Sequence, residues 1–377
     1  MKRIGYLDSL RGYALICIML DHMPVGTVRQ LTLVNFAIFD AAELFVLLSG
    51  FLVGMVWVKI EAREGLSAAQ WRFAKRSFQV WRALIIGGIM IALLSRFLWS
   101  FDMEHTAVWY EYSNWIVAHP FGYIVTLAVL WMQPNLLDVL ALYVILLASA
   151  PIFVPLLIRS PALFAAGSVM LWWFAPPLNA LIPNQRPDPG FLFNPFGWQM
   201  LFYAGVGIGI FRRQIYAALA PWAKWITIFA TFIVIYSLLM ATLWKFGGVW
   251  KDICDAMWRM VGTVNKWRMD GFRFLAIMCA TWLVAVPLSR PINWLANTRL
   301  GRGAADIGRG GLFSFILCVM LSIIGDAMVV NTPDASKWTK ISMETWTVLV
   351  LWLGSHMWLH RQVFWDWVAA RRSKGQG

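Results

Sequence analysis

The chain has 377 residues, of which 60% are hydrophobic and only 14% are charged, and its mean hydropathy is +0.64. This composition excludes an ordinary soluble domain and favours a protein of the lipid bilayer. The formal net charge is +13. Because the basic residues are spread over many loops rather than gathered in one patch, this charge predicts no nucleic-acid partner.

Apolar stretches long enough to cross a bilayer recur along the chain. They predict an all-α fold, a polytopic transmembrane bundle of about ten helices, with residues 1–377 as one integral membrane domain. The predicted spans are 7–28, 39–58, 78–98, 136–158, 161–181, 195–211, 222–244, 271–288, 310–330 and 342–362. The apolar stretch 119–134 is too short to span, so we expect a re-entrant or interfacial element there.

Lysine and arginine positions predict the orientation of these helices. With a cytoplasmic N-terminus, the basic loops fall on the cytoplasmic side, and the long 99–135 connection, which lacks Lys and Arg, falls outside. The positive-inside rule therefore favours two cytoplasmic termini. We expect no removable signal peptide, because the first stretch carries Asp8 and Arg11 and lacks a small-residue cleavage site.

Three other patterns predict structure rather than chemistry. The four cysteines are scattered without metal-ligand spacing, so we expect neither a zinc site nor a disulfide framework. His356 and His360 are four residues apart, but no acidic residue lies between them, and we expect no metal there. Gly205, Gly207 and Gly209 lie inside an apolar stretch, where small residues let helices approach closely.

The first predicted span carries two costly ionisable residues, Arg11 and His22. Eleven helical steps separate them, so they share one face, roughly 20° apart around the axis and about 16 Å apart along it. Asp8 lies on the same polar stripe. Ionisable groups inside spans usually serve a function.

The second predicted span begins with Asp40 and Glu43, at about the depth of His22. A carboxylate that holds one ring nitrogen of a histidine makes the other nitrogen a better general base. Periodicity leaves the partner open among Asp21, Asp40 and Glu43, and Glu43 is preferred. The alternative interpretation is a His–Glu pair that only ties two helices together.

Several segments resemble the OpgC family, which consists of multi-pass inner-membrane proteins within the type 3 membrane acyltransferase class. The N-terminal signature comprises residues 8–12, 21–24, 35–36, 40–46 and 49–51. Residues 133–143 and 194–202 resemble two further family elements, and 271–275 resemble a third. The similarity spans most of the chain in the right order.

This resemblance implies O-acyl transfer in a bacterial inner membrane, from a cytoplasmic acyl-CoA, succinyl-CoA in the named family, to a hydroxyl of a periplasmic glucan. It implies no bound cofactor, and acyl-CoA acts as the donor substrate. Carried over by position, His22 is the catalytic base, with Glu43 beside it. The residues implied in donor or substrate binding are Arg11, Asp8, Asp40, Trp198, Gln199, Arg273 and Arg302.

One segment departs from the family pattern. After Arg302, where a polar residue and a serine are expected, the chain continues with glycine and alanine through residues 303–305. Donor binding by residues 301–311 is therefore left open. The loop aromatics Trp109, Tyr110, Tyr112 and Trp115 fit either sugar stacking or an interfacial belt.

A secondary transporter remains the alternative, with Arg11, His22 and Glu43 as a proton relay. A non-enzymatic partner in glycan export is a third, weaker option. The acyl group, the acceptor and the oligomeric state are not fixed by the sequence.

Overall fold

The computed structural model describes residues 5–184 and 189–374, and side chains up to residue 361. It is all-α, with 81% helix and no strand in the described residues. The helices are α1 (Gly5–Asp21), α2 (Ala41–Glu64), α3 (Leu66–Trp99), α4 (Tyr110–Ala118), α5 (Pro120–Ala128), α6 (Asp138–Arg159), α7 (Pro161–Trp173), α8 (Ala175–Ala180), α9 (Pro195–Leu219), α10 (Ala223–Thr242), α11 (Gly248–Val261), α12 (Gly271–Ala285), α13 (Ser289–Asn297), α14 (Arg299–Gly310), α15 (Leu312–Val330) and α16 (Lys337–Lys374). The 3₁₀ turns are η1 (Val28–Leu31), η2 (Leu33–Asn35), η3 (Ala220–Trp222) and η4 (Leu243–Phe246).

Within these ranges, five helices are long and apolar enough to cross a membrane. They are α2, α3, α6, the continuous stretch Pro195–Phe246 and α15, and a sixth counts if α12 and α13, bent by 75°, form one span. Each predicted span overlaps a helix, but α1 has only 17 residues and α7 only 13. The count of about ten therefore stays a prediction. The orientation also stays a prediction, because helix length and composition do not say which end of the bundle faces the cytoplasm; residues 1–4 and 375–377 lie outside the described ranges.

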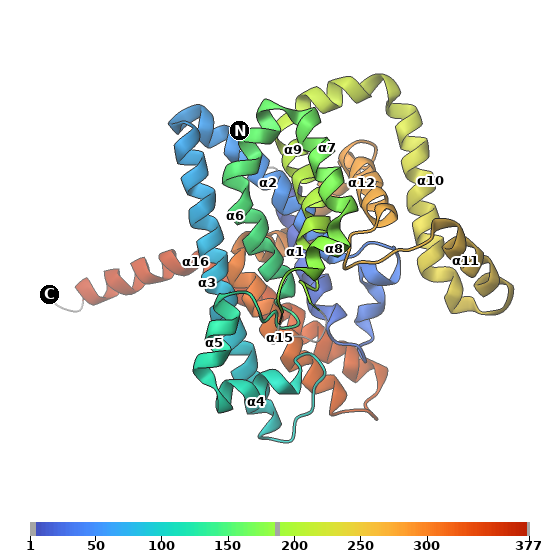
Figure 1. The fold of residues 1–377 in the computed structure, drawn as a ribbon. Helices are drawn as coiled ribbons and strands as arrows, with labels where there is room; N and C mark the ends of the chain where they lie inside the picture. Colours follow the sequence, from blue (N-terminus) through green and yellow to red (C-terminus); the bar gives the residue numbers. More distant parts are fainter. Residues whose placement is uncertain (1–4, 185–188, 375–377) are drawn as a thin grey trace.

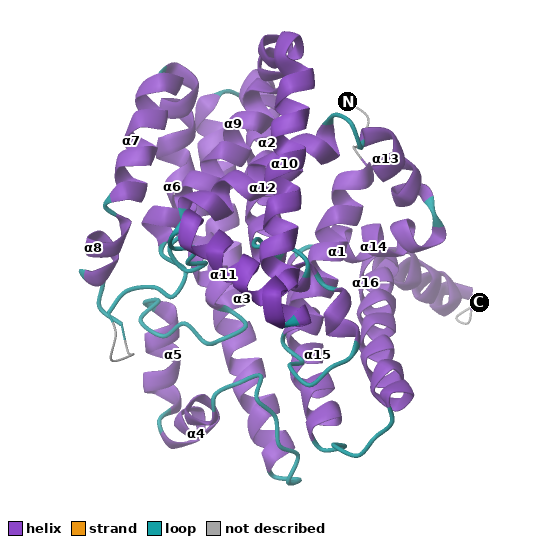
Figure 2. Ribbon diagram, turned by 90° about the vertical axis from the view of Figure 1, so that its right-hand side faces the viewer, coloured by secondary structure: helices purple, strands orange, loops and turns teal. Residues whose placement is uncertain are grey.

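The helices pack around α1 and α2. Helix α1 lies against α2, α14 and α15, while α2 packs along α9 and α3 packs along α6. Figure 1 shows α10 and α11 at one side of the bundle and the end of α16 projecting from the other. In Figure 2, turned by 90°, α4 and α5 lie at one end of the molecule. The N-terminal motifs thus lie at the centre of the bundle.

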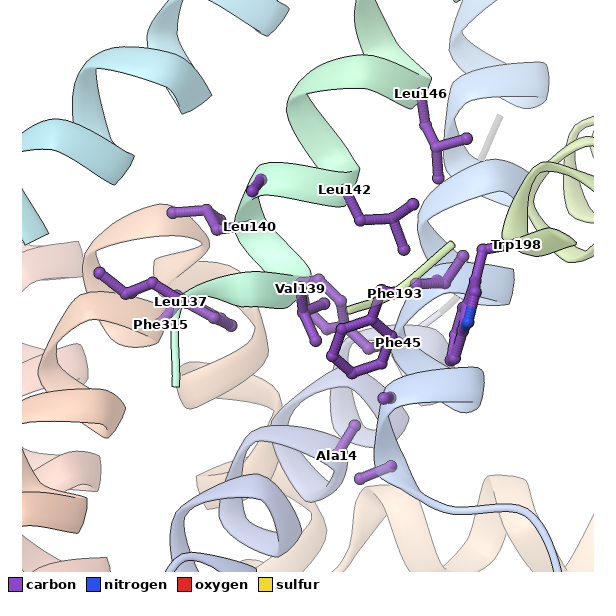
Figure 3. Close-up of a cluster of buried hydrophobic side chains, with 14 of the residues drawn as sticks. Ala14, Phe45, Leu137, Val139, Leu140, Leu142, Leu146, Phe193, Trp198 and Phe315 are labelled. Carbon is purple, nitrogen blue, oxygen red and sulfur yellow. The ribbon is translucent and has the colours of Figure 1, made fainter. Parts of the chain in front are cut away.

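Large apolar side chains from separate helices fill this centre. Figure 3 shows Phe45 of α2 near Val139 of α6, Trp198 of α9 and Ala14 of α1. Phe45 also packs against Phe315 of α15, with ring centroids 5.9 Å apart. Aromatic pairs at this spacing add to the stabilisation from burial. This core fixes α1, α2, α9 and α15 relative to one another.

Glycines allow the close contact between α2 and α9. A Cβ added at Gly205 would collide with the Leu47 carbonyl, and one at Gly209 would collide with the Phe51 carbonyl. Gly50 of α2 similarly faces the Phe202 carbonyl, whereas Gly207 faces open space. The predicted close approach is confirmed for Gly205 and Gly209, and Gly207 takes no part in it.

We expect Gly205→Ala to destabilise the fold by about 1–3 kcal/mol, because the methyl group forces α2 and α9 apart. Gly207→Ala is the matched control on the same helix, and it should be neutral or slightly stabilising. Thermal unfolding of both variants in detergent checks this. Equal melting temperatures for the two variants would contradict the packing described for α2 and α9.

Candidate functional site

The start of α2 holds two buried carboxylates in a capping box. The Asp40 side chain accepts a hydrogen bond from the Ala42 amide at 2.8 Å, and the Glu43 side chain accepts one from the Asp40 amide at 3.0 Å. Such a box satisfies free amides at a helix start. The local sequence Asp-Ala-Ala-Glu therefore fixes both carboxylates in one place, which we name the outer centre after the side that the sequence predicts for it.

A distant arginine neutralises Glu43. Arg273 of α12 donates through Nε to Oε1 of Glu43 at 2.6 Å, and its Nη2 contacts the same oxygen. The same Nη2 lies 3.7 Å from Asp40 Oδ2. Glu43 has no exposed surface and Arg273 is only 9% exposed. Buried charges persist when they are paired in this way. Arg273, implied by the resemblance alone, thus lies in the outer centre.

Lys266 completes the outer centre, although no sequence motif predicts a role for it. Its Nζ lies 2.6 Å from Asp40 Oδ2, and Trp198 Nε1 donates to its backbone carbonyl at 3.1 Å. Burial disfavours the Lys266 ammonium, but Asp40 and Glu43 outweigh burial and raise the pKa of Lys266 above its ordinary value. Lys266 therefore stays protonated. In the sequence, Lys266 is marked only as a basic residue in a loop that is predicted to lie on the non-cytoplasmic side of the membrane.

His22 lies directly after α1 and has a defined tautomer. Its Nδ1 lies 2.7 Å from the Ile18 carbonyl oxygen, which can only accept, so Nδ1 carries the proton. The other nitrogen, Nε2, keeps a lone pair for accepting a proton. Asp40, Lys266 and Arg29 lie within electrostatic reach of the ring.

This geometry corrects the preferred partner of His22. Glu43 bonds Arg273 and the Asp40 amide, while Asp21 accepts a hydrogen bond from Thr32. Across the described residues, the recorded hydrogen bond of the His22 ring goes to a backbone carbonyl four residues earlier. A carbonyl takes the orienting role expected of a carboxylate, because the last turn of α1 leaves its carbonyls without helical partners.

Arg29 is a second residue of this region for which no sequence motif predicts a role. It lies in η1, in the connection between α1 and α2. Glu344 of α16 accepts hydrogen bonds from the amides of Thr27, Val28 and Arg29 and so anchors this turn. The Nε atom of Arg29 is buried and has no hydrogen-bond partner among the described residues. A buried donor of this kind suits an oxygen of a bound molecule.

A second charged group, the inner cluster, lies at the other end of α1. Arg309 Nε is 3.5 Å from Asp8 and its Nη1 is 3.3 Å from Asp306, which lies 3.1 Å from His356 Nδ1. The glycine-rich segment that departs from the family pattern forms α14 and packs on α1, because Gly308 faces the Asp8 carbonyl. Sequence reasoning missed Asp306 and Arg309, which supply the charges here.

Three residues that the sequence predicts for the site lie away from the outer centre or make other contacts. Arg302 is exposed and donates to the Asn297 carbonyl at 2.8 Å. Gln199 bonds Ser168 of α7 at 2.8 Å and lines a cavity of about 770 Å³ between α6, α7 and α9. Trp198 faces the Lys266 loop. Trp198 and Gln199, expected to line one centre, therefore face different elements. Arg11 is half-buried on α1.

An apolar cavity of about 320 Å³ lies between α1, α2, α9 and α12. Its lining includes Tyr6 and Leu7 near the start of α1, beside the inner cluster residue Asp8. It also includes Phe39, the neighbour of Asp40 in the outer centre. The wall of the cavity is almost entirely apolar, and no charged side chain of either group belongs to its lining.

These features define a polytopic helical membrane protein with a charged centre buried at the start of its second helix. A family model described as OpgC protein matches residues 3–361, and the chain belongs to this family. Membership implies a membrane acyltransferase of the OpgC type. No curated protein and no solved structure matches the chain.

Proposed function

We propose that this protein is a bacterial inner-membrane O-acyltransferase that moves a small acyl group, such as succinyl, from cytoplasmic acyl-CoA to a hydroxyl of a periplasmic glucan. The observation that carries the proposal is the hydrogen bond from His22 Nδ1 to the Ile18 carbonyl, which leaves Nε2 able to accept a proton. Family membership supplies the reaction class. Both chain ends would face the cytoplasm.

The chemistry needs a base and a positive charge near it. Nε2 of His22 takes the proton of the sugar hydroxyl as its oxygen forms a bond to the thioester carbonyl carbon. The carbonyl oxygen becomes negative, and the buried Nε of Arg29 is suited to stabilise it. The carbon–sulfur bond then breaks, the thiolate leaves, and the imidazolium returns its proton to the sulfur. The products are an ester and free CoA.

The donor would approach from the inner end. The cavity between α1, α2 and α12 has an almost entirely apolar wall, which suits the uncharged arm of a CoA thioester. Arg11 and Arg309 suit the phosphates of the same donor, because guanidinium groups bind phosphate well. Asp8 would position Arg309, which lies 3.5 Å from it.

The outer centre would act by positioning rather than by proton transfer. Lys266 contacts Asp40, and Arg273 contacts Glu43, so these two pairs tie the start of α2 to the loop before α12 and to α12 itself. A proton relay through Glu43, as in the transporter alternative, would require breaking its buried pair with Arg273 at considerable cost. This pairing favours the enzyme over the transporter.

Reconstituted vesicles test the proposal. Protein in liposomes, given CoA carrying a labelled succinyl group and a glucose oligosaccharide, should produce labelled oligosaccharide. Empty liposomes measure the uncatalysed background. Label that stays on CoA, together with protein-dependent uptake of a solute, would overturn the proposal in favour of the transporter.

A further inference from the structure

A polar pocket of about 270 Å³ lies beside the outer centre, and the mechanism above does not use it. It lies between α8, residues 189–194 and the 265–268 loop. We propose that this pocket, the acceptor pocket, binds sugar rings of the carbohydrate acceptor; this inference rests on the proposed function. The polar residues and the tryptophan of its wall are Asn179, Asn184, Asn194, Asn265, Trp267 and Arg268.

The chemistry of this wall suits a neutral sugar. Trp267 is 40% exposed, and its ring meets the Phe193 ring edge-on with centroids 5.0 Å apart, so part of its apolar surface remains accessible. Sugar rings carry an apolar C–H face that packs on such a surface, and their hydroxyls both donate and accept hydrogen bonds. Asparagine amides can do the same. An apolar platform flanked by amides therefore matches the two-sided character of a sugar ring.

The pocket has hydrogen-bonding capacity to spare. Asn265 uses its side-chain oxygen to accept from the amides of Trp267 and Arg268, at 2.8 and 3.3 Å. Its Nδ2 bonds no residue in the described part of the chain, and neither does the exposed guanidinium of Arg268. These groups are the donors that a hydroxyl would meet.

The walls of the pocket are held in place before any ligand binds. Asn179 bonds both backbone groups of Phe191, at 2.9 and 3.0 Å. Gln133 accepts from the Leu192 amide at 3.1 Å. The amide of Asn194 donates to the Trp267 carbonyl at 3.0 Å and joins the two loops. Preorganised walls reduce the entropy lost on binding.

The position of the pocket links it to the outer centre. Trp267 directly follows Lys266, whose Nζ lies 2.6 Å from Asp40 and 5.4 Å from the Trp267 ring centroid. A sugar on Trp267 would therefore lie next to the charged residues around His22. A polymer of several sugars could present one hydroxyl to the base while a neighbouring ring occupies the pocket.

Steady-state kinetics with variants of this loop test the inference. Trp267→Ala should raise the KM for a glucose oligosaccharide about tenfold, with kcat and the KM for acyl-CoA unchanged, because a stacking surface is lost. Asn265→Ala should also raise the acceptor KM. Trp250→Ala is the matched control, since Trp250 of α11 is 54% exposed and lies outside the pocket.

Equilibrium binding separates this inference from the proposed function. Calorimetric titration of the detergent-solubilised protein with glucose oligosaccharides should give saturable binding that Trp267→Ala removes. If sugar binds but no variant or wild-type protein transfers an acyl group, the proposed function fails and the pocket stands. If transfer proceeds and Trp267→Ala leaves both acceptor KM and sugar binding unchanged, the pocket assignment is overturned. Displacement of the sugar by inorganic phosphate would also overturn it in favour of an anion site.

Discussion

Replacing His22 with alanine is expected to lower the rate of acyl transfer by about 10²- to 10⁴-fold, because the reaction loses its general base. The hydrogen bond from Nδ1 to the Ile18 carbonyl is lost as well, but it is a local bond within the last turn of α1. The fold should therefore persist. Transfer of labelled acyl groups in reconstituted liposomes, together with thermal unfolding in detergent, measures both effects.

His119→Ala is the matched control for this experiment. His119 is an exposed histidine at the start of α5, and no ion pair is recorded for it in the described structure. Its replacement should leave the rate unchanged. A His22→Ala protein that unfolds normally and still transfers acyl groups at the wild-type rate would rule out His22 as the base.

Replacing Arg273 with leucine should destabilise the protein by about 3–5 kcal/mol, because Glu43 is then left charged and buried without its partner. Glu43 has no exposed surface, so water cannot compensate. The melting temperature in detergent should fall well below that of the wild type. Arg259→Leu, an exposed arginine on α11, should melt like the wild type.

A second substitution distinguishes pairing from simple loss of packing. In the double variant Glu43→Gln/Arg273→Leu, no full charge remains buried at position 43, so part of the lost stability should return. A double variant that is no more stable than Arg273→Leu would mean that the two side chains act independently. The ion pair would then contribute nothing specific to the outer centre.

Local patterns predicted the parts of the site that lie close together in sequence. Asp40 and Glu43 are three residues apart, so helix geometry alone places both carboxylates at the start of α2. The close approach at Gly205 and Gly209 followed from small residues inside an apolar helix. The all-α class followed from composition. The information for the carboxylates and for the glycines lies within one helix each.

Partners far apart in sequence could not be predicted from periodicity. Lys266 and Arg273 reach Asp40 and Glu43 from more than 200 residues away, through the loop before α12 and the first turn of α12. The partner of His22 was missed for another reason, since a backbone carbonyl leaves no mark in the sequence. The predicted first span also extended past residue 21, where α1 ends, because apolar residues continue into the turn.

Mass spectrometry of periplasmic glucans tests the central claim most directly. Glucans from cells that produce the protein should carry the mass increment of an added acyl group, and cells with the His22→Ala protein should yield unmodified glucans. Protein abundance in the membrane, measured by immunoblot, must be equal in both strains. Identical glucan masses in the two strains would contradict the assignment of this protein as a glucan acyltransferase that uses His22.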